Sequence, residues 1–125
     1  MTTTPDQVRQ WARIAASAAS AKGGEDTVIL EVGEVLAITD AFVVTSGRNS
    51  RQVKTIAEEV EARLKSDGAI TPLRVEGLGD TQWVLLDYGD LVVHVFLDET
   101  RGFYDLERLW SDVPRLEWED EAARS

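Results

Sequence analysis

The sequence of 125 residues contains no cysteine and a single histidine, His94. Without cysteine, the chain has no disulfide framework, no thiolate nucleophile and no cysteine-based zinc site. A single histidine excludes paired-histidine zinc motifs and leaves little room for a histidine-rich metal site. We therefore expect no bound metal and no cofactor.

Long apolar runs are also absent. No stretch approaches the roughly 18 apolar residues of a membrane-spanning helix. The N-terminus lacks the apolar segment after a basic region that marks a secretory signal. We therefore expect a soluble, cytoplasmic protein that does not bind a membrane.

Positive charge is scarce. Lysine and arginine total 13 against 23 aspartates and glutamates, so the formal net charge is -10. Phosphates repel such a chain, which argues against direct nucleic-acid binding and favours a basic partner. The hydrophobic content of 43% is ordinary for a globular domain, and the length suits one domain.

Two segments carry the signals of helices. The first begins at Thr4-Pro5-Asp6-Gln7, a capping box with proline at the first helical position, and ends at Gly23-Gly24. The second follows Asn49, a favourable N-cap, and Gly68 is predicted just past its end. Apolar residues recur at helical spacing in this second segment: Val53, Ile56, Ala57, Val60 and Leu64.

Five segments predict strands: 27–31, 41–46, 72–76, 82–87 and 91–97. The last two form a hairpin through Tyr88-Gly89, and strand 91–97 is apolar on both faces, as central strands are. Segment 103–110 predicts a short final helix, and 117–125 an acidic, flexible tail. This order predicts one α/β (α+β) domain over residues 1–116, with a single mixed sheet of about five strands flanked by helices.

The turn Ser46-Gly47 lies between a strand and a helix, where nucleotidyltransferase-like folds place a phosphate. Such enzymes need two or three carboxylates on a neighbouring strand to bind two metal ions. Strand 72–76 offers only Glu76. We therefore favour a structural turn and expect no catalytic residues, with a metal-dependent nucleotidyltransferase-like enzyme as the alternative.

The hairpin turn Asp87-Tyr88-Gly89-Asp90 carries two carboxylates. Aspartates in turns commonly accept hydrogen bonds from their own backbone, so a structural role is favoured over metal binding. Tyr88 at the tip is expected to be exposed and available for contact. His94 is interpreted as a hydrogen-bonded core residue, and Arg101 could pair with Glu107.

Aromatic side chains gather in the last third of the chain: Trp83, Tyr88, Phe103, Tyr104 and Trp110. Most are expected to pack in the core. Tryptophan and tyrosine flanked by carboxylates are nevertheless typical of a protein-binding hot spot. An acidic protein-interaction module with some basic partner is therefore a second alternative.

Three motifs occur together in this part of the chain. They are Trp83–Asp90 (WVLLDYGD), Val92–Phe96 (VVHVF) and Tyr104–Trp110 (YDLERLW). In combination they resemble the ribosomal silencing factor family, also called the RsfS or Iojap family. The resemblance covers about Val8 to Trp110, so the acidic tail lies outside it.

The resemblance implies a mixed sheet with nucleotidyltransferase-like topology that lacks the catalytic carboxylates. It implies a regulator, not an enzyme. Members bind the large ribosomal subunit through its protein number fourteen, block joining of the small subunit and lower translation when nutrients are scarce. Homodimers occur in the family when the protein is free, and the ribosome-bound form is a monomer. The lack of an Arg/Ser-rich leader favours a bacterial cytoplasmic member.

The resemblance also transfers a partner-binding surface to seven residues: Glu76, Trp83, Asp87, Tyr88, Asp90, Tyr104 and Glu107. The aromatic members would anchor the ribosomal protein, and the acidic members would pair with its lysines or arginines. His94 and Arg101 match the family motifs as well and are expected to be structural.

Overall fold

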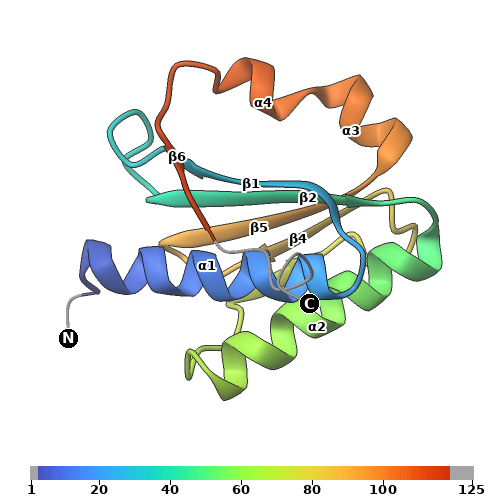
Figure 1. The fold of residues 1–125 in the computed structure, drawn as a ribbon, viewed down its shortest axis with the longest axis horizontal. Helices are drawn as coiled ribbons and strands as arrows, with labels where there is room; N and C mark the ends of the chain where they lie inside the picture. The colour runs from blue at the N-terminus through green and yellow to red at the C-terminus, as the bar shows by residue number, and fades with distance from the viewer. Residues whose placement is uncertain (1–2, 119–125) are drawn as a thin grey trace.

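A six-stranded sheet forms the centre of the computed structural model, which describes residues 3–118 (Figure 1). Its strands are β1 (Glu25–Glu31), β2 (Ala41–Gly47), β3 (Arg74–Glu76), β4 (Trp83–Asp87), β5 (Leu91–Leu97) and β6 (Arg115–Leu116). Their order across the sheet is β3-β4-β5-β2-β1-β6, in which β2 and β5 are parallel and the other neighbours antiparallel. The predicted mixed α/β fold is confirmed. The strand beyond the expected five is β6, whose two residues are too few to show an alternating pattern.

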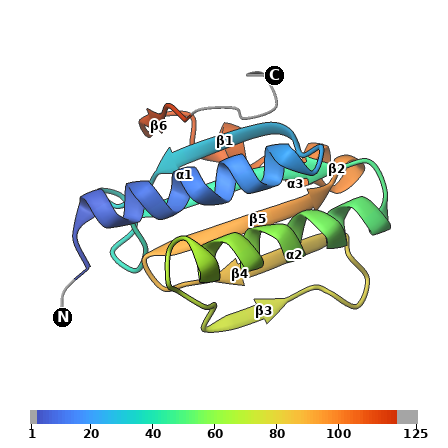
Figure 2. The same cartoon turned by 60° about the horizontal axis from the view of Figure 1, so that its bottom comes forward.

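Two long helices, α1 (Pro5–Ala21) and α2 (Ser50–Ser66), lie side by side across one face of the sheet (Figure 2). The predicted capping box is present: Thr4 Oγ1 accepts from the Gln7 amide at 3.2 Å, and Gln7 Oε1 accepts from the Thr4 amide at 3.1 Å. Asn49 caps α2 by accepting from the Gln52 amide at 2.9 Å. Local sequence therefore fixes where both helices begin.

The main core lies between these helices and the sheet. In α1 the buried stripe is mostly alanine, and small side chains let the helix approach its neighbours closely: Ala12, Ala15, Ala16, Ala18 and Ala19 are fully buried. A second cluster lies on the opposite face of the sheet around Leu30, Val44 and Phe96. Strand β5 supplies Val93 to the first cluster and Phe96 to the second, which confirms the prediction of a strand covered on both sides.

Two short helices, α3 (Asp98–Tyr104) and α4 (Leu106–Leu109), cover part of this opposite face (Figure 1). The prediction of one helix over 103–110 is wrong, because the chain leaves the helical conformation at Asp105, whose φ is 49°. Aspartate is among the few residues that tolerate this left-handed conformation. The break redirects the chain across the sheet toward β6.

The chain after β6 lies along β1 and α1. Trp118 donates from Nε1 to the Thr27 carbonyl at 3.1 Å, and Arg13 donates from Nε to the Glu117 carbonyl at 3.3 Å. Of the predicted tail 117–125, these first two residues are therefore in contact with the domain, and 119–125 lie outside the described residues. None of the helices within 3–118 is long and apolar enough to cross a membrane.

The turn after α2 yields a stability prediction. Ala69 has a φ of 56°, a conformation that costs an alanine about 1 kcal/mol, so Ala69→Gly should raise the unfolding midpoint by about 3 °C. The neighbouring Gly68→Ala should do the reverse, since its Cβ would lie 2.9 Å from the Leu64 carbonyl oxygen and 3.0 Å from Trp11 Cδ1. Thermal unfolding followed by circular dichroism measures the midpoint of each variant. An unchanged or lower midpoint for Ala69→Gly would show that the backbone conformation of Ala69 does not cost stability.

Candidate protein-binding face

On the side of the sheet away from α1 and α2, aromatic rings form a continuous chain. Ring centroids are separated by 5.9 Å for Trp110–Phe42, 4.7 Å for Phe42–His94, 5.8 Å for His94–Trp83, 4.9 Å for Trp83–Tyr104 and 5.2 Å for Tyr104–Phe103. All these separations lie in the range of favourable aromatic contact. We call these six residues the aromatic face: Phe42, Trp83, His94, Phe103, Tyr104 and Trp110.

The sheet register explains how the rings on the strands, those of Phe42, Trp83 and His94, come together. Phe42 of β2 lies beside Val92 of the parallel strand β5, two residues from His94. Trp83 of β4 lies beside Phe96 of β5 and packs on its ring at 4.8 Å. Three strands thus bring aromatic side chains together that are up to 54 residues apart in the sequence, counted from Phe42 to Phe96.

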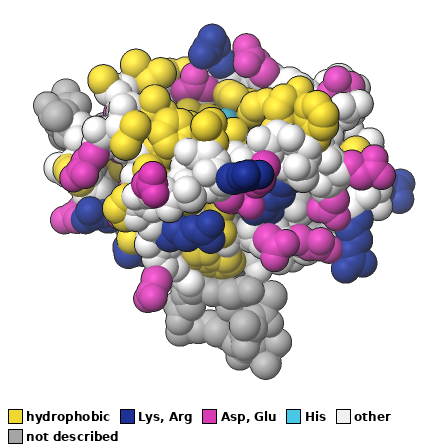
Figure 3. All heavy atoms as spheres, turned by 90° about the horizontal axis from the view of Figure 1, so that it is seen from above, with side chains coloured by type: hydrophobic (Ala, Val, Ile, Leu, Met, Phe, Trp, Pro, Cys, Tyr) yellow, Lys and Arg dark blue, Asp and Glu magenta, His cyan; other side chains and the backbone are white. Residues whose placement is uncertain are grey.

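The apolar residues on the two short helices above the sheet are exposed. Phe103 is 82% and Tyr104 52% exposed on α3, and Leu109 of α4 is 71% exposed. In Figure 3, which looks onto this side, yellow apolar side chains gather around the cyan of the single histidine. Exposed apolar surface of this kind is typical of a protein-binding site.

His94 lies in the middle of the face and is hydrogen-bonded, as predicted. Trp83 donates from Nε1 to His94 Nδ1 at 3.0 Å. Because Nδ1 accepts this bond, the hydrogen of the neutral ring is on Nε2. Burial lowers the pKa of His94 from its ordinary value near 6.5 to about 4, so the ring is neutral at physiological pH.

Arg101 holds α3 and α4 on the sheet. Its side chain donates from Nε to Glu107 Oε1 at 3.0 Å and from Nη1 to the Glu25 carbonyl at 2.8 Å. It also donates to Ser46 Oγ at 3.0 Å and to the Asp26 carbonyl. Arg101 is only 8% exposed, so the predicted ion pair with Glu107 is confirmed and shielded from water.

Ser46 and Gly47, predicted as a turn, are the last two residues of β2, and Ser46 takes part in the same contacts. The Ser46 hydroxyl accepts from Arg101 and donates to the Glu25 carbonyl at 3.4 Å. Within residues 3–118, no group of three or more histidines, aspartates or glutamates stands close enough to hold a metal ion. The Ser46 hydroxyl thus links the end of β2 to Arg101 of α3 and to the start of β1.

Five of the seven residues predicted from the resemblance lie on this side of the sheet. Glu76 lies beside Leu85, which lies beside His94, so all three side chains share the face. Trp83 and Asp87 each lie two residues from Leu85 on β4, so their side chains are on the same face as Leu85. Tyr104 and Glu107 belong to the helices above it.

The two aspartates of the hairpin turn have different surroundings. Asp87 accepts from the Gly89 amide at 2.8 Å and from Arg74 Nη2 at 3.0 Å, which confirms its predicted role in the turn. The Gly89 hydrogen bond, with a smaller contribution from Arg74, lowers the pKa of Asp87. Asp90 accepts through its main-chain carbonyl from the amides of Asp40 and Ala41, which joins the hairpin to the start of β2.

Tyr88 lies on the wrong side for the predicted contact. It packs against the core under α1 and α2, and its hydroxyl is buried with no hydrogen-bond partner in the part of the chain that the structure describes. Burial, together with Glu61 of α2, raises the pKa of Tyr88. The expectation of an exposed Tyr88 at the tip is wrong, because the chain after β4 turns this ring toward the helices.

Phe42 is part of the aromatic face, and Leu109 is exposed on α4, but neither was among the residues predicted from the sequence. Alternation along 41–47 puts Phe42 opposite the main core, and this signal was available. Its place beside His94 depends on the parallel pairing of β2 and β5, which local patterns do not specify.

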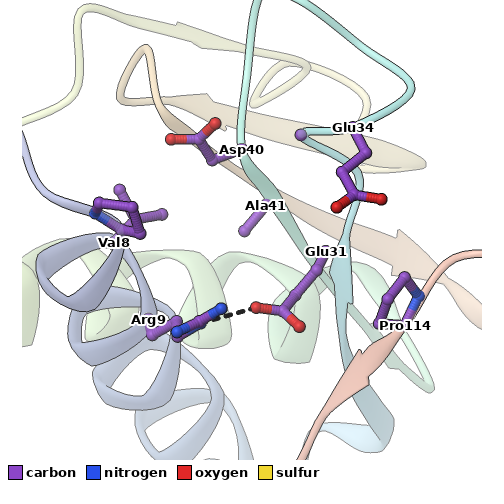
Figure 4. A pocket seen from close by; sticks show the side chains of 9 residues that line it. Val8, Arg9, Glu31, Glu34, Asp40, Ala41 and Pro114 are labelled. Atoms are coloured by element: carbon purple, nitrogen blue, oxygen red, sulfur yellow. Dashed lines mark hydrogen bonds and ion pairs between the residues drawn. The ribbon is translucent and has the colours of Figure 1, made fainter.

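A pocket of about 360 Å³ lies elsewhere, between the start of α1 and the β1–β2 loop (Figure 4). Arg9 donates from Nε to Glu31 Oε1 across it at 2.8 Å, and the carboxylates of Glu34 and Asp40 lie around it. None of the residues predicted for the binding surface lines this pocket. The aromatic face is therefore a separate feature of the molecule.

Comparisons with known proteins identify relatives. A family model described as ribosomal silencing factor during starvation matches residues 5–125, which is longer than the Val8–Trp110 resemblance. The ribosomal silencing factor RsfS of Bacillus subtilis is 38% identical over 102 residues, 82% of this chain and 86% of that protein. A crystal structure of a Chromobacterium violaceum protein superposes with a TM-score of 0.79 at 31% identity and covers 94% of this chain and 96% of that one.

More distant relatives come from organelles. The mouse protein named mitochondrial assembly of ribosomal large subunit protein 1 is 28% identical over 95 residues, 72% of this chain and 40% of that protein. The chloroplastic protein Iojap of maize is 31% identical over 105 residues, 82% of this chain and 44% of that protein.

The fold and the aromatic face define a class, namely a single α/β domain whose exposed surface has the chemistry of a protein interface. Within that class, the chain belongs to the ribosomal silencing factor family, which confirms the resemblance noted in the sequence.

His94 yields a prediction of pH dependence. Its pKa is about 4 in the folded chain and near 6.5 when unfolded, so between these values only the unfolded chain binds the proton. Stability from this group is complete above pH 6.5 and is lost progressively as the pH falls from 6.5 to 4. Urea unfolding measures the free energy of unfolding at pH 7.0 and at pH 4.5. The decrease between the two pH values should be about 2–3 kcal/mol larger in the wild type than in His94→Gln. An equal loss in both proteins would exclude His94 as the cause.

Proposed function

We propose that this protein binds the large ribosomal subunit through the aromatic face and blocks its association with the small subunit. Bound there, it represses translation in the cytoplasm under nutrient limitation. The observation that carries the proposal is the exposed pair Phe103 and Tyr104 at the end of a chain of packed rings. Family membership supports it, since the family is described as silencing during starvation, and the mouse relative is named for assembly of the large subunit.

The proposed contact within the subunit is its protein number fourteen. The charge of this chain supports a protein contact, because a net charge of -10 is repelled by ribosomal RNA and attracted by basic side chains. A domain that occupies a surface required by the other subunit needs no chemical step. We therefore propose that the protein acts by occupancy and is not an enzyme.

Among the predicted contact residues, we propose two roles: aromatic anchors and charged groups. Tyr104 is the main anchor, and Trp83 supports it from below through ring contact at 4.9 Å. Glu76 is exposed and shares the face with Leu85 and His94, so we assign its carboxylate to a lysine or arginine of the ribosomal protein. We propose the same role for Asp90, which directly precedes β5 and whose main-chain carbonyl is already bound to the start of β2. Asp87, Glu107 and Tyr88 are engaged inside the domain and are left out of the proposed contact.

Truncation of the anchor tests the proposal. Tyr104→Ala should weaken binding to large subunits about tenfold or more, as expected for a central aromatic residue, and should leave the fold intact because half of the ring is exposed. The measurement is co-sedimentation with separated large subunits, followed by the yield of whole ribosomes after small subunits are added. Trp83→Ala is a poorer test, because it also removes the hydrogen bond to His94.

The matched control is Tyr88→Phe. It alters the other tyrosine of the chain, on the opposite side of the sheet, and removes only an unpartnered hydroxyl. It should bind and inhibit like the wild type. If the wild-type protein neither sediments with large subunits nor lowers the yield of whole ribosomes, the proposed function is wrong. Capture of a different basic protein instead would favour the acidic interaction module.

The acidic residues give a prediction about salt. At low salt, the double variant Glu76→Gln, Asp90→Asn should bind large subunits a few-fold more weakly than the wild type. As the salt concentration rises, the variant should lose less affinity than the wild type does. Exposed charges steer association and are screened by ions, so the difference from the wild type should shrink above about 0.3 M salt. Identical salt profiles for the two proteins would show that these carboxylates do not face the partner.

A further inference from the structure

One polar atom in the aromatic face has no partner. His94 is only 5% exposed, and its Nε2 is buried and makes no hydrogen bond to any group of residues 3–118. Nδ1 is committed as the acceptor of the Trp83 indole N–H, so Nε2 carries the hydrogen and is a donor with no acceptor. A buried donor left unpaired costs free energy that its surroundings must offset, so each such group in a native structure needs an explanation.

The position of this donor connects it to the binding face. His94 projects from the central strand β5 toward the side that carries α3 and α4, between Leu85 of β4 and Val44 of β2. Nε2 belongs to the distal edge of the imidazole ring, which is the part farthest from the sheet in a side chain that stands on it. Figure 3 shows the histidine ring from outside, among the apolar side chains of the face.

We propose that His94 Nε2–H is the specificity-determining donor of the aromatic face and binds a main-chain carbonyl of the protein partner. This inference rests on the proposed function and adds to it the chemical group that is recognised at the centre of the contact. The surrounding rings supply nonspecific apolar area, whereas a single buried donor rejects any partner that brings no acceptor to this point.

The acceptor is a neutral carbonyl and not a phosphate or carboxylate. The carboxylate of Glu76, in the same cross-strand row as His94, and the overall charge of -10 would repel an anionic group. The imidazole is neutral, so it offers no positive charge in compensation. A main-chain carbonyl accepts such a hydrogen bond with no charge to desolvate.

Access to Nε2 requires only a local change. The rings that contact His94 include Phe42 at 4.7 Å and Trp83 at 5.8 Å, and both are half-buried. Tyr104, which packs against Trp83, is 52% exposed and free on its outer side. Rotamer changes of interface side chains are common on binding, and a change in one of these rings uncovers the distal edge of the imidazole.

Two conservative variants of His94 test the acceptor Nδ1 and the donor Nε2 independently. In His94→Asn, the amide oxygen replaces Nδ1 as acceptor for Trp83 and nothing replaces Nε2. In His94→Gln, the amide nitrogen reaches about as far as Nε2 and can donate, whereas the Trp83 bond is lost. Binding to separated large subunits is measured by co-sedimentation over a range of protein concentrations, with the folded fraction of each variant determined by circular dichroism.

The expected result is that His94→Asn binds about tenfold more weakly than the wild type, while His94→Gln stays within about threefold of it. If the role of His94 were only structural, His94→Asn would bind as well as His94→Gln or better, because only asparagine preserves the bond to Trp83. If the folded asparagine variant binds as well as the wild type, or both variants bind equally weakly, the inference is wrong.

The same experiment distinguishes failure of the inference from failure of the proposed function. Wild-type binding that depends on Tyr104 but is indifferent to both His94 variants overturns only the assignment of the donor. Absence of wild-type binding to large subunits overturns the proposed function itself.

Discussion

The buried guanidinium of Arg101 is the contact on which the binding face depends. One side chain joins the carbonyls of Glu25 and Asp26 at the start of β1, the hydroxyl of Ser46 at the end of β2, and Glu107 of α4. A buried charge is tolerated only when it is paired and hydrogen-bonded, so all of these groups must be in place together. Helix α3, which carries Tyr104, and helix α4 are consequently fixed to the sheet by polar contacts, which leaves their apolar side chains available at the surface.

The two faces of the sheet serve different purposes. One face is closed by α1 and α2, and its strand residues are almost entirely apolar and fully buried. The other is covered by two short helices, so its apolar cluster continues to the surface through Trp83 and Tyr104. Strand β5 belongs to both faces, which places His94 on a rigid element at the centre of the surface. A site on a central strand is held more precisely than one on a loop.

Charge and apolar surface act together in the proposed mechanism. Aromatic anchors provide most of the affinity of a protein interface, and charged groups at its edge provide steering and register. Glu76 lies in the same cross-strand row as His94, so a carboxylate borders the aromatic face directly. A regulator that works by occupying a surface needs these two features and no reactive group. In the proposed contact, the net charge of -10 favours a basic protein over ribosomal RNA.

Local sequence determined the two long helices and the β4–β5 hairpin, but not the break between α3 and α4 or the short strand β6, because caps, periodicity and turn residues act over a few positions. The capping box at Thr4, the cap at Asn49 and the hairpin before β5 all form as predicted. Tertiary structure decided which side chains meet. The parallel pairing of β2 and β5 brings Phe42 to His94, and the turn after β4 sends Tyr88 to the opposite side. These outcomes depend on strand order and register, which are set by packing between segments far apart in the sequence and not by any local pattern.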